Sequence, residues 1–344
     1  MRVERLAEEV QRFLHAKDYP DDFDLIKLSG DASEREYYRI KFHPICQDER
    51  LTASSLVVMR MLEPSPDRER AFTECRAILE EAGVNVPHLF HQSDDGTLFL
   101  LEDFGDQTQE QTVVGREDTS ECESLYIKAI DTLVKIQFEP MKRPRHDCPA
   151  FQLAFDEEKL MWELDFFLEN VIRIYSGKTI AEKDEKFLRE KFLEVVRSLA
   201  AEPRFFTHRD YHSRNLMVCG DEIGVLDFQD ARMGLIQYDL VSLLRDSYVS
   251  LPEPLVEKLK KYYTGGAESV LGEKINRDHF EYIFLMMTVQ RSLKAAGSFA
   301  YLDCVKKKGR YLQHLPTAIS HAIRAMEQLG MNRLAEVITH YTNE

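Results

Sequence analysis

The sequence predicts an α+β fold with two lobes, a small β-rich lobe at the N-terminal end and a larger, mostly helical lobe after it. Short apolar runs separated by turn residues occupy the first hundred residues, a pattern typical of strands. Long stretches with apolar residues at helical spacing dominate from residue 119 onward. Because the pattern changes near residues 103–110, we divide the chain into an N-terminal lobe over 1–104 and a C-terminal lobe over 105–344.

The N-terminal lobe begins with a predicted helix over residues 2–15, where Val3, Leu6 and Val10 recur at helical spacing. Turn residues and prolines then divide the chain into short pieces. The other elements expected in this lobe are strands near 23–28, 37–42, 56–59 and 98–101, and a helix over 67–82.

The C-terminal lobe is expected to be helical apart from one small hairpin. Short apolar pieces at 205–206, 216–218 and 223–226 alternate with polar loops, which favours strands there. Helices are expected over 119–138, 151–175, 183–201, 238–249, 253–263, 279–296, 316–328 and 331–341.

The composition narrows the classes of function. With 45 Lys and Arg against 60 Asp and Glu, the net charge is −15, so a general nucleic-acid binder, which needs a basic face, is not expected. Any bound phosphate must be held by a local cation cluster or a metal ion. No apolar run approaches the roughly 20 residues of a membrane span, and the charged start of the chain does not fit a signal sequence. The six scattered cysteines predict free thiols in a reducing cytoplasm.

Residues 208–215, with the sequence HRDYHSRN, form the densest polar group and lie between two apolar segments. Asp227 follows twelve residues after Asn215, and the pattern H-x-D-x-x-x-x-N with a later D-F is that of the catalytic and metal loops of kinases. An HxD tripeptide alone arises by chance, but the complete spacing favours a phosphotransferase site. We predict that Asp210 orients the acceptor hydroxyl and accepts its proton. We further predict that Asn215 and Asp227 hold Mg²⁺ and that His208 braces the loop.

The same pattern predicts nucleotide-binding elements upstream. Arg60 ends the run LVVMR where kinases carry a lysine, and Glu74 on the next helix is its expected partner, although both suit ordinary surface positions equally well. Glu102 and Asp103 form the expected hinge whose backbone groups read adenine. The phosphate-covering turn, with one glycine where kinases have three, is expected at Gly30, Asp31, Ala32 and Ser33.

On these residues the chain resembles the aminoglycoside phosphotransferase and choline kinase group of small-molecule kinases. The resemblance implies a protein-kinase-like, two-lobe fold with ATP bound in the cleft. The segment Tyr238-Asp239-Leu240 favours this group over a protein kinase, because no A-P-E segment follows Asp227 and no activation loop has room before Tyr238. The resemblance further implies that Asp239 is structural and buried against the catalytic loop.

A closer similarity spans about residues 25–320. The segments THRDYHSRNLM (207–217), VLDFQDA (225–231) and YDLVSLLRD (238–246) are similar to those of cell-wall-recycling sugar kinases, which phosphorylate the anomeric hydroxyl of N-acetylmuramate and N-acetylglucosamine. The similarity implies a cytoplasmic enzyme of peptidoglycan recycling that uses ATP and Mg²⁺ and makes a sugar 1-phosphate. In this subfamily the third-strand cation is commonly missing, so Arg60 does not mark an inactive enzyme.

The acceptor is expected to be a small-molecule sugar, and the residues suggest candidates for binding it. Asp230 is expected to bind a sugar hydroxyl or else to cap the following turn. Arg214 is expected to approach the transferred phosphoryl group, orient the sugar or form a surface salt bridge. N-acetylmuramate carries a lactyl carboxylate, and its nearest cationic candidates are Arg214, Arg232, Arg291 and Lys294.

Alternatives stay open at this point. An aminoglycoside would prefer an acidic groove, which the net charge permits, and choline would need an aromatic cage, for which the sequence gives no clustering signal. The chain could therefore be another hydroxyl kinase of the group. It could also be a nucleotide-binding pseudokinase that serves as an interaction module, supported only by Arg60 and the single-glycine turn. Neither nucleic acid nor a membrane is an expected partner, and the sequence predicts no oligomeric state.

Overall fold

The strands of the N-terminal part form one antiparallel sheet in the order β1-β2-β3-β5-β4. The structure is a computed structural model that describes residues 2–28, 35–43 and 55–343, so the predicted turn of Gly30, Asp31, Ala32 and Ser33 lies outside the described residues. The strands are β1 (Phe23–Lys27), β2 (Arg35–Phe42), β3 (Ser55–Met61), β4 (Leu89–Gln92) and β5 (Leu98–Glu102).

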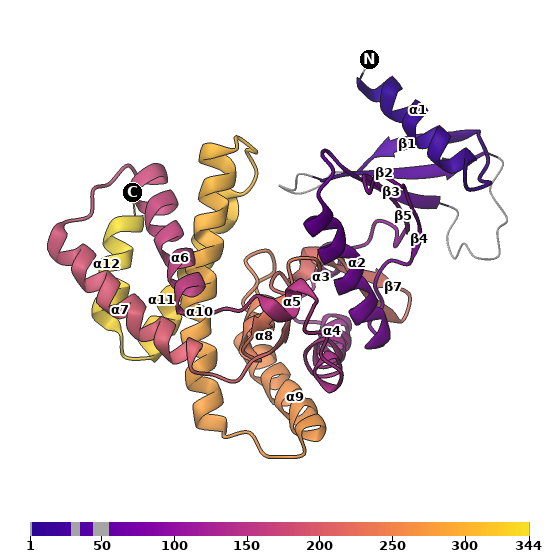
Figure 1. Cartoon of the computed structure of the whole chain (residues 1–344). Coiled ribbons are helices and arrows are strands. Elements are labelled where there is room, and N and C mark those ends of the chain that lie inside the picture. The colour runs from indigo at the N-terminus through magenta and orange to yellow at the C-terminus, as the bar shows by residue number, and fades with distance from the viewer. Residues whose placement is uncertain (1, 29–34, 44–54, 344) are drawn as a thin grey trace.

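Each face of this sheet packs against one helix. Side chains alternate along a strand, so Val58 and Met59 of β3 point to opposite faces. Val58 packs in one core cluster with α1 (Arg2–His15), and Met59 packs in the other with α2 (Pro66–Glu81). Figure 1 shows the two helices on opposite sides of the sheet. The face toward α2 is continuous with the main core of the molecule, whereas the face toward α1 has a small core of its own.

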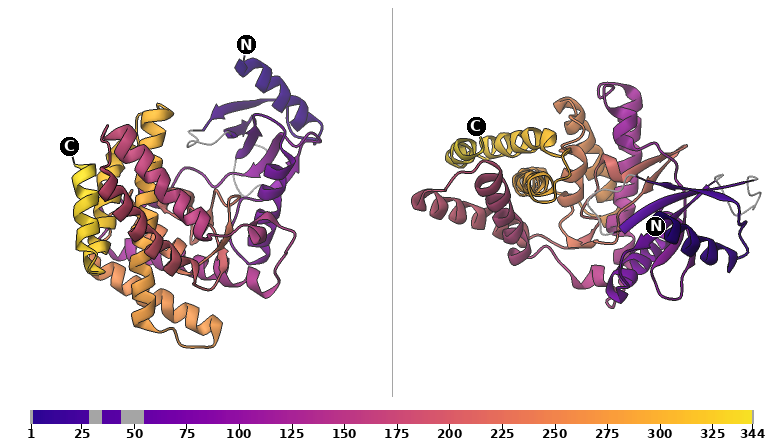
Figure 2. Two further views of the ribbon diagram at one scale, coloured as in Figure 1. Left: turned by 60° about the vertical axis from the view of Figure 1, so that its left-hand side comes forward. Right: turned by 90° about the horizontal axis from the view of Figure 1, so that it is seen from above.

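The rest of the chain is mostly helical, which confirms the predicted α+β class. The division at residue 104 falls between β5 and α3, the first helix of this part. The longest helix, α10, lies against α6, α7, α8 and α11, and Figures 1 and 2 show it running through the middle of this region. The helices are α3 (Gln109–Val113), α4 (Ser120–Phe138), α5 (Pro149–Gln152), α6 (Glu157–Phe167), α7 (Glu182–Ala200), α8 (Gln237–Leu244), α9 (Glu253–Leu271), α10 (Arg277–Ala300), α11 (Leu315–Gln328) and α12 (Asn332–Thr342).

Two short strand pairs interrupt the helices. The hairpin of β7 (Leu216–Cys219) and β8 (Glu222–Val225) is the one that the sequence predicts, whereas the pairing of β6 (Phe205–Thr207) with β9 (Arg232–Gly234) was not anticipated. The polar loop 208–215 leaves β6 and enters β7, so both pairs hold it in place.

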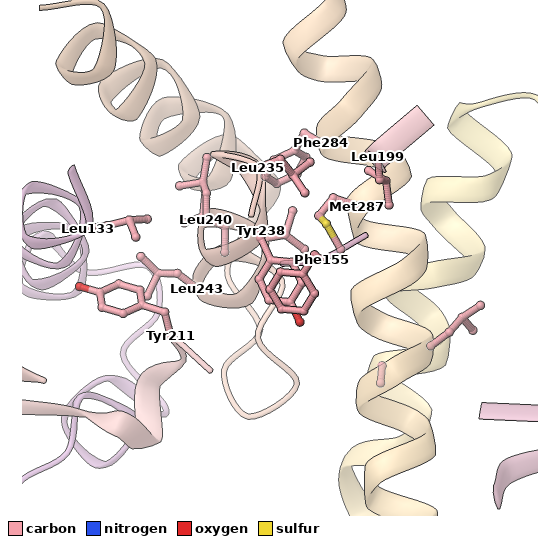
Figure 3. Packing of buried hydrophobic residues seen from close by; sticks show 14 of the residues in the cluster. Leu133, Phe155, Leu199, Tyr211, Leu235, Tyr238, Leu240, Leu243, Phe284 and Met287 are labelled. Atoms are coloured by element: carbon pink, nitrogen blue, oxygen red, sulfur yellow. The ribbon is translucent and has the colours of Figure 1, made fainter. Parts of the chain in front are cut away.

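The core of the helical part lies directly beneath this loop. Tyr211, in the middle of the polar segment, is fully buried, and its hydroxyl donates a hydrogen bond to the carbonyl of Ala129 on α4 (2.8 Å). Phe155 and Tyr238 stack with their ring centroids 4.0 Å apart. Figure 3 shows Tyr211 and Tyr238 among the apolar side chains of this cluster. The loop is therefore anchored from below by large buried rings, which bury much apolar area each.

Two further expectations concern membranes and thiols. In the described parts of the chain, every helix is too short or too polar to cross a bilayer. Cys46 lies outside the described residues, and the other five cysteines are free thiols, as expected.

Candidate active site

The loop over residues 208–215 is held by two buried carboxylates. The backbone N–H groups of His208 and Arg209 donate to Asp239 on α8 at 2.7 and 2.9 Å. The backbone N–H and hydroxyl of Ser213 both donate to Asp246 (2.9 and 2.5 Å). A carboxylate that accepts two hydrogen bonds fixes the backbone between them, because buried donors must stay paired. Asp239 is thus buried against the loop, in the position that the resemblance implies for it.

His208 lies beneath the loop and not in the open part of the site. Its Nε2 is 2.9 Å from the carbonyl oxygen of Leu226, so this nitrogen carries the proton and donates. Burial lowers the pKa of His208 to about 4, which keeps the ring neutral near neutral pH. This neutral imidazole links the loop over residues 208–215 to the segment before Asp227.

Asp210 faces two cations from α10. Its Oδ1 lies 3.0 Å from Nζ of Lys294 and 3.3 Å from a guanidinium nitrogen of Arg291, and Arg209 approaches from its own loop (3.9 Å). Enclosure by protein raises the pKa of Asp210, but the charges of Lys294, Arg209 and Arg291 outweigh it and hold the pKa well below its usual range. The carboxylate is therefore ionised and fixed in orientation.

Asn215 and Asp227 offer hard oxygen donors near Asp210. The amide nitrogen of Asn215 donates to the backbone carbonyl of Asp210 (2.9 Å), so its amide oxygen is the atom left for a metal ion. Burial of Asp227 and the negative charge of Asp210 raise the pKa of the Asp227 carboxyl. A hydrogen bond from Gln229 and the positive charge of Arg35 partly oppose this rise. A divalent cation would relieve that repulsion.

The donor set fits Mg²⁺ and does not fit a closed metal cage. The described residues contain no cluster of three or more His, Cys, Asp or Glu side chains that could hold a metal ion. Mg²⁺ is commonly bound by one or two carboxylates together with substrate phosphates and water, so a pair of protein ligands suffices.

Two residues of the site, Arg209 and Asp227, have strained backbone conformations. Arg209 and Asp227 adopt positive φ angles of 85° and 61°, which side-chain-bearing residues rarely adopt. Such conformations cost on the order of 1–3 kcal/mol each and cluster at functional sites. Two of the four described non-glycine residues with positive φ are Arg209, next to Asp210, and Asp227 itself; the other two are Asp18 and Lys307.

A cavity of about 1050 Å³ connects these residues to the sheet. Val57 and Leu101 line its apolar part, and Glu102 and Asp103 stand at its edge. The Asp103 side chain is fully engaged, since it accepts hydrogen bonds from Arg39 (2.5 and 2.9 Å), from the hydroxyl of Ser55 and from the N–H of Gly105. The Asp103 side chain is therefore occupied within the protein, and the expectation that backbone groups at residues 102–103 read adenine stays a prediction.

The structure does not bring Arg60 and Glu74 together. Arg60 contacts Glu9 of α1 (3.1 Å) and Glu36 of β2 (3.7 Å), whereas Glu74 pairs with Arg70 one turn away (2.7 Å). The reason is the alternation of side chains along β3. Arg60 lies on the same face of the sheet as Val58, and this face packs against α1 and does not line the cavity. This corrects the expected pair.

The cation that does reach the cavity from this sheet is Arg35. In the β2–β3 register, Arg35 is opposite Met61 and Tyr37 is opposite Met59, which places all four on the face of Val57. Arg35 and Tyr37 both line the cavity, and Arg35 is close enough to Asp227 to oppose the rise in its pKa. Sequence reasoning missed Arg35 because the pairing register is needed to see it.

The remaining predicted substrate residues occupy different surroundings. Arg214 makes two 2.9 Å contacts with Glu110 and lies 3.6 Å over the ring of Tyr248, so the salt-bridge alternative is realised within the cavity wall. Asp230 is exposed at the rim, 3.3 Å from Arg209. Arg291 is buried and also donates to the hydroxyl of Ser242 (2.9 Å).

The fold and this site define a kinase that acts on small molecules. A model of the phosphotransferase enzyme family matches residues 24–272, and the chain belongs to that family. Among curated proteins it is similar to the N-acetylmuramate/N-acetylglucosamine kinase of Neisseria meningitidis serogroup B, with 31% identity over 308 residues, 89% of this chain and 87% of that protein. The kinase of the same name from Pseudomonas aeruginosa is 33% identical over 296 residues, 85% and 81% of the two chains.

Solved structures extend the likeness of the fold. A choline kinase from Cryptosporidium parvum Iowa II superimposes with a TM-score of 0.63 at 11% identity, over 99% of this chain and 100% of that one. An ADP-bound aminoglycoside phosphotransferase gives a TM-score of 0.53 at 15% identity, over 93% and 97%. At such low sequence identity the structural similarity shows the fold alone. The shared fold supports the predicted two-lobe architecture.

Proposed function

We propose that this chain is an ATP- and Mg²⁺-dependent sugar kinase of peptidoglycan recycling that acts in the cytoplasm on the anomeric hydroxyl of N-acetylmuramate and N-acetylglucosamine. The observation that carries the kinase chemistry is the Asp210 carboxylate, held ionised between Lys294 and Arg291 beside Asn215 and Asp227. The support for the acceptor is the similarity to kinases of these two sugars over more than four fifths of both chains.

The proposed chemistry needs little beyond positioning. Asp210 accepts a hydrogen bond from the acceptor hydroxyl, aligns its oxygen with the phosphorus and takes the proton late, because a carboxylate with so low a pKa is a weak base. Asn215 and Asp227 would hold Mg²⁺, which when bound neutralises the phosphate charge. Arg35 supplies the cation that the sheet presents to the phosphates, the role that the sequence assigns to Arg60.

The charge of the cavity bears on the competing acceptors. Eight Arg and Lys and eight Asp and Glu line it, although the whole chain has 15 more acidic than basic residues. Binding of a polycationic aminoglycoside would be favoured by an acidic groove. The cavity, with equal numbers of acidic and basic residues, is not such a groove. An uncharged or acidic sugar needs no such groove.

Phosphorus NMR of the product tests this proposal. After reaction with Mg²⁺-ATP and N-acetylmuramate, we expect a sugar phosphate whose phosphorus couples to H1. A product whose phosphorus couples to another ring proton would contradict the anomeric assignment. Asp210→Asn serves as the control for contaminating kinases.

A further inference from the structure

The cavity that holds Asp210 is also lined by aromatic side chains of α6 and of the segment that follows α10. Trp162 and Phe166 are one turn apart on α6 and stack with their centroids 5.4 Å apart at 25°. Tyr301, which follows α10 directly, meets Phe166 at 5.4 Å. We call Trp162, Phe166 and Tyr301 the aromatic wall.

Close packing of the two helices creates this wall. A Cβ atom on Gly297 of α10 would come within 3.0 Å of the Cα of Phe167 and 3.2 Å of the ring of Phe166. Any larger residue at position 297 would therefore require α6 or the ring of Phe166 to shift by a few tenths of an ångström, so glycine favours the close approach of the two helices. A glycine within a helix costs about 1 kcal/mol relative to alanine, so the close approach has a measurable price in stability.

Trp162 is the exposed member of the wall, whereas Phe166 and Tyr301 are partly buried. Trp162 is 54% exposed, although tryptophan is normally largely buried. The ammonium of Lys159 lies 3.9 Å from the centre of the Trp162 ring, and the side chain of Trp162 still lines the cavity. An aromatic surface that opens into a cavity beside polar groups is typical of a ligand site.

We infer that the aromatic wall is the platform on which the acceptor sugar lies, an inference that rests on the proposed function and specifies it. A pyranose ring has an apolar C–H face that can cover an aromatic surface while its hydroxyls remain free for hydrogen bonds. Asp210, Lys294 and Arg291 stand in the same cavity, so a sugar lying on the wall presents a hydroxyl to the catalytic carboxylate. The cations also suit an acceptor with a carboxylate.

Trp162 is the single tryptophan of the chain, so tryptophan emission reports on the wall alone. Titration of the protein with N-acetylmuramate, without nucleotide, should change this emission with saturation. Trp162→Ala should raise the KM for the sugar about tenfold, the loss of one aromatic contact surface, with the KM for ATP unchanged. Trp162→Phe, which keeps a ring, should recover most of the affinity. Tyr282→Ala, at an exposed aromatic residue of α10 outside the cavity lining, is the matched control.

The outcomes separate this inference from the proposed function. If the sugar is phosphorylated but Trp162→Ala leaves its KM unchanged, the platform is overturned and the proposed function stands. If the sugar saturates the emission change but no phosphorylated product forms, the platform is supported and the proposed function fails. If the sugar causes neither turnover nor an emission change, both are overturned.

Discussion

At the scale of single residues, Arg35 and Arg60 form a matched pair for testing how the sheet presents charge to the nucleotide. Arg35 lines the cavity, whereas Arg60 is engaged with Glu9 and Glu36 on the other face. A hydrogen bond to a charged group contributes about 1.5–3 kcal/mol, so Arg35→Met should raise the KM for ATP at least about tenfold. Arg60→Met should change it less than about twofold. If steady-state kinetics gave the larger rise in the KM for ATP for Arg60→Met, Arg60 and not Arg35 would be the nucleotide-binding cation.

Asp227 is tested by the stabilisation that nucleotide gives. A ligand at about 100 times its Kd stabilises a protein by about 2.7 kcal/mol, so Mg²⁺-ATP should raise the wild-type melting temperature by several degrees. We expect Asp227→Ala to lose the part of this rise that depends on Mg²⁺. Asp221→Ala, at a fully exposed carboxylate, should keep it. A full Mg²⁺-dependent rise in Asp227→Ala would remove Asp227 from the metal site.

Lys294 makes stability depend on pH. Burial lowers its pKa to about 8, from an ordinary value of 10.5, although Asp210 opposes the shift. Above pH 8 the folded state therefore binds fewer protons than the unfolded state, and the free energy of unfolding rises with pH up to about 10.5. Relative to Lys294→Met, the wild type should gain on the order of 1–2 kcal/mol between about pH 7.5 and 9.5 in urea titrations. A flat difference between the two proteins would show that Lys294 is not desolvated.

At the scale of elements, α8 holds the loop over residues 208–215 through Asp239. Replacement by asparagine keeps the shape but turns one of two acceptors into a donor that faces a backbone N–H group. We expect Asp239→Asn to lower the free energy of unfolding by about 1–3 kcal/mol, the cost of leaving a buried donor unpaired. Chemical denaturation measures this loss, and an unchanged midpoint and slope would mean that the loop does not depend on α8.

Elements with a strong local pattern could be predicted from the sequence, and elements defined by distant partners could not. The helix over 120–138 and the strand over 98–102 carry long apolar patterns, and the structure places both within two residues of the prediction. β4 and β9 were missed because the four half-buried residues 89–92 and the three residues 232–234 are too short for a pattern. Their pairing with β5 and β6 supplies what the local sequence lacks.

The same difference between local patterns and distant partners applies to the residues of the site. Asp210, Asn215 and Asp227 lie in one stretch of eighteen residues, so their spacing in the sequence was enough to predict them. Arg35 required the pairing register of β2 on β3, which the local sequence of either strand does not give. Trp162 showed no clustering in sequence because Tyr301, at the far end of the wall, is more than a hundred residues away. Sites assembled from separate helices need the packing angles that no sequence pattern records.

At the scale of the whole molecule, a strongly acidic chain encloses an electrically balanced cavity. The net charge of the chain is −15, whereas Arg35, Arg291 and Lys294 contribute positive charge to the lining of the cavity, where we propose that a triphosphate binds. The sheet and the helices both line this cavity, so our proposal places nucleotide, acceptor and the Asp210 carboxylate in one enclosed site.

The most direct test of the central claim is ADP release from the purified protein with Mg²⁺-ATP and a panel of acceptors. We expect turnover with N-acetylmuramate and N-acetylglucosamine and none with kanamycin or choline. Asp210→Asn should fold normally and lose about 10²–10⁴-fold in kcat. Turnover with kanamycin or choline alone would contradict the proposed acceptor, and binding of ATP without turnover on any acceptor would contradict the enzyme itself.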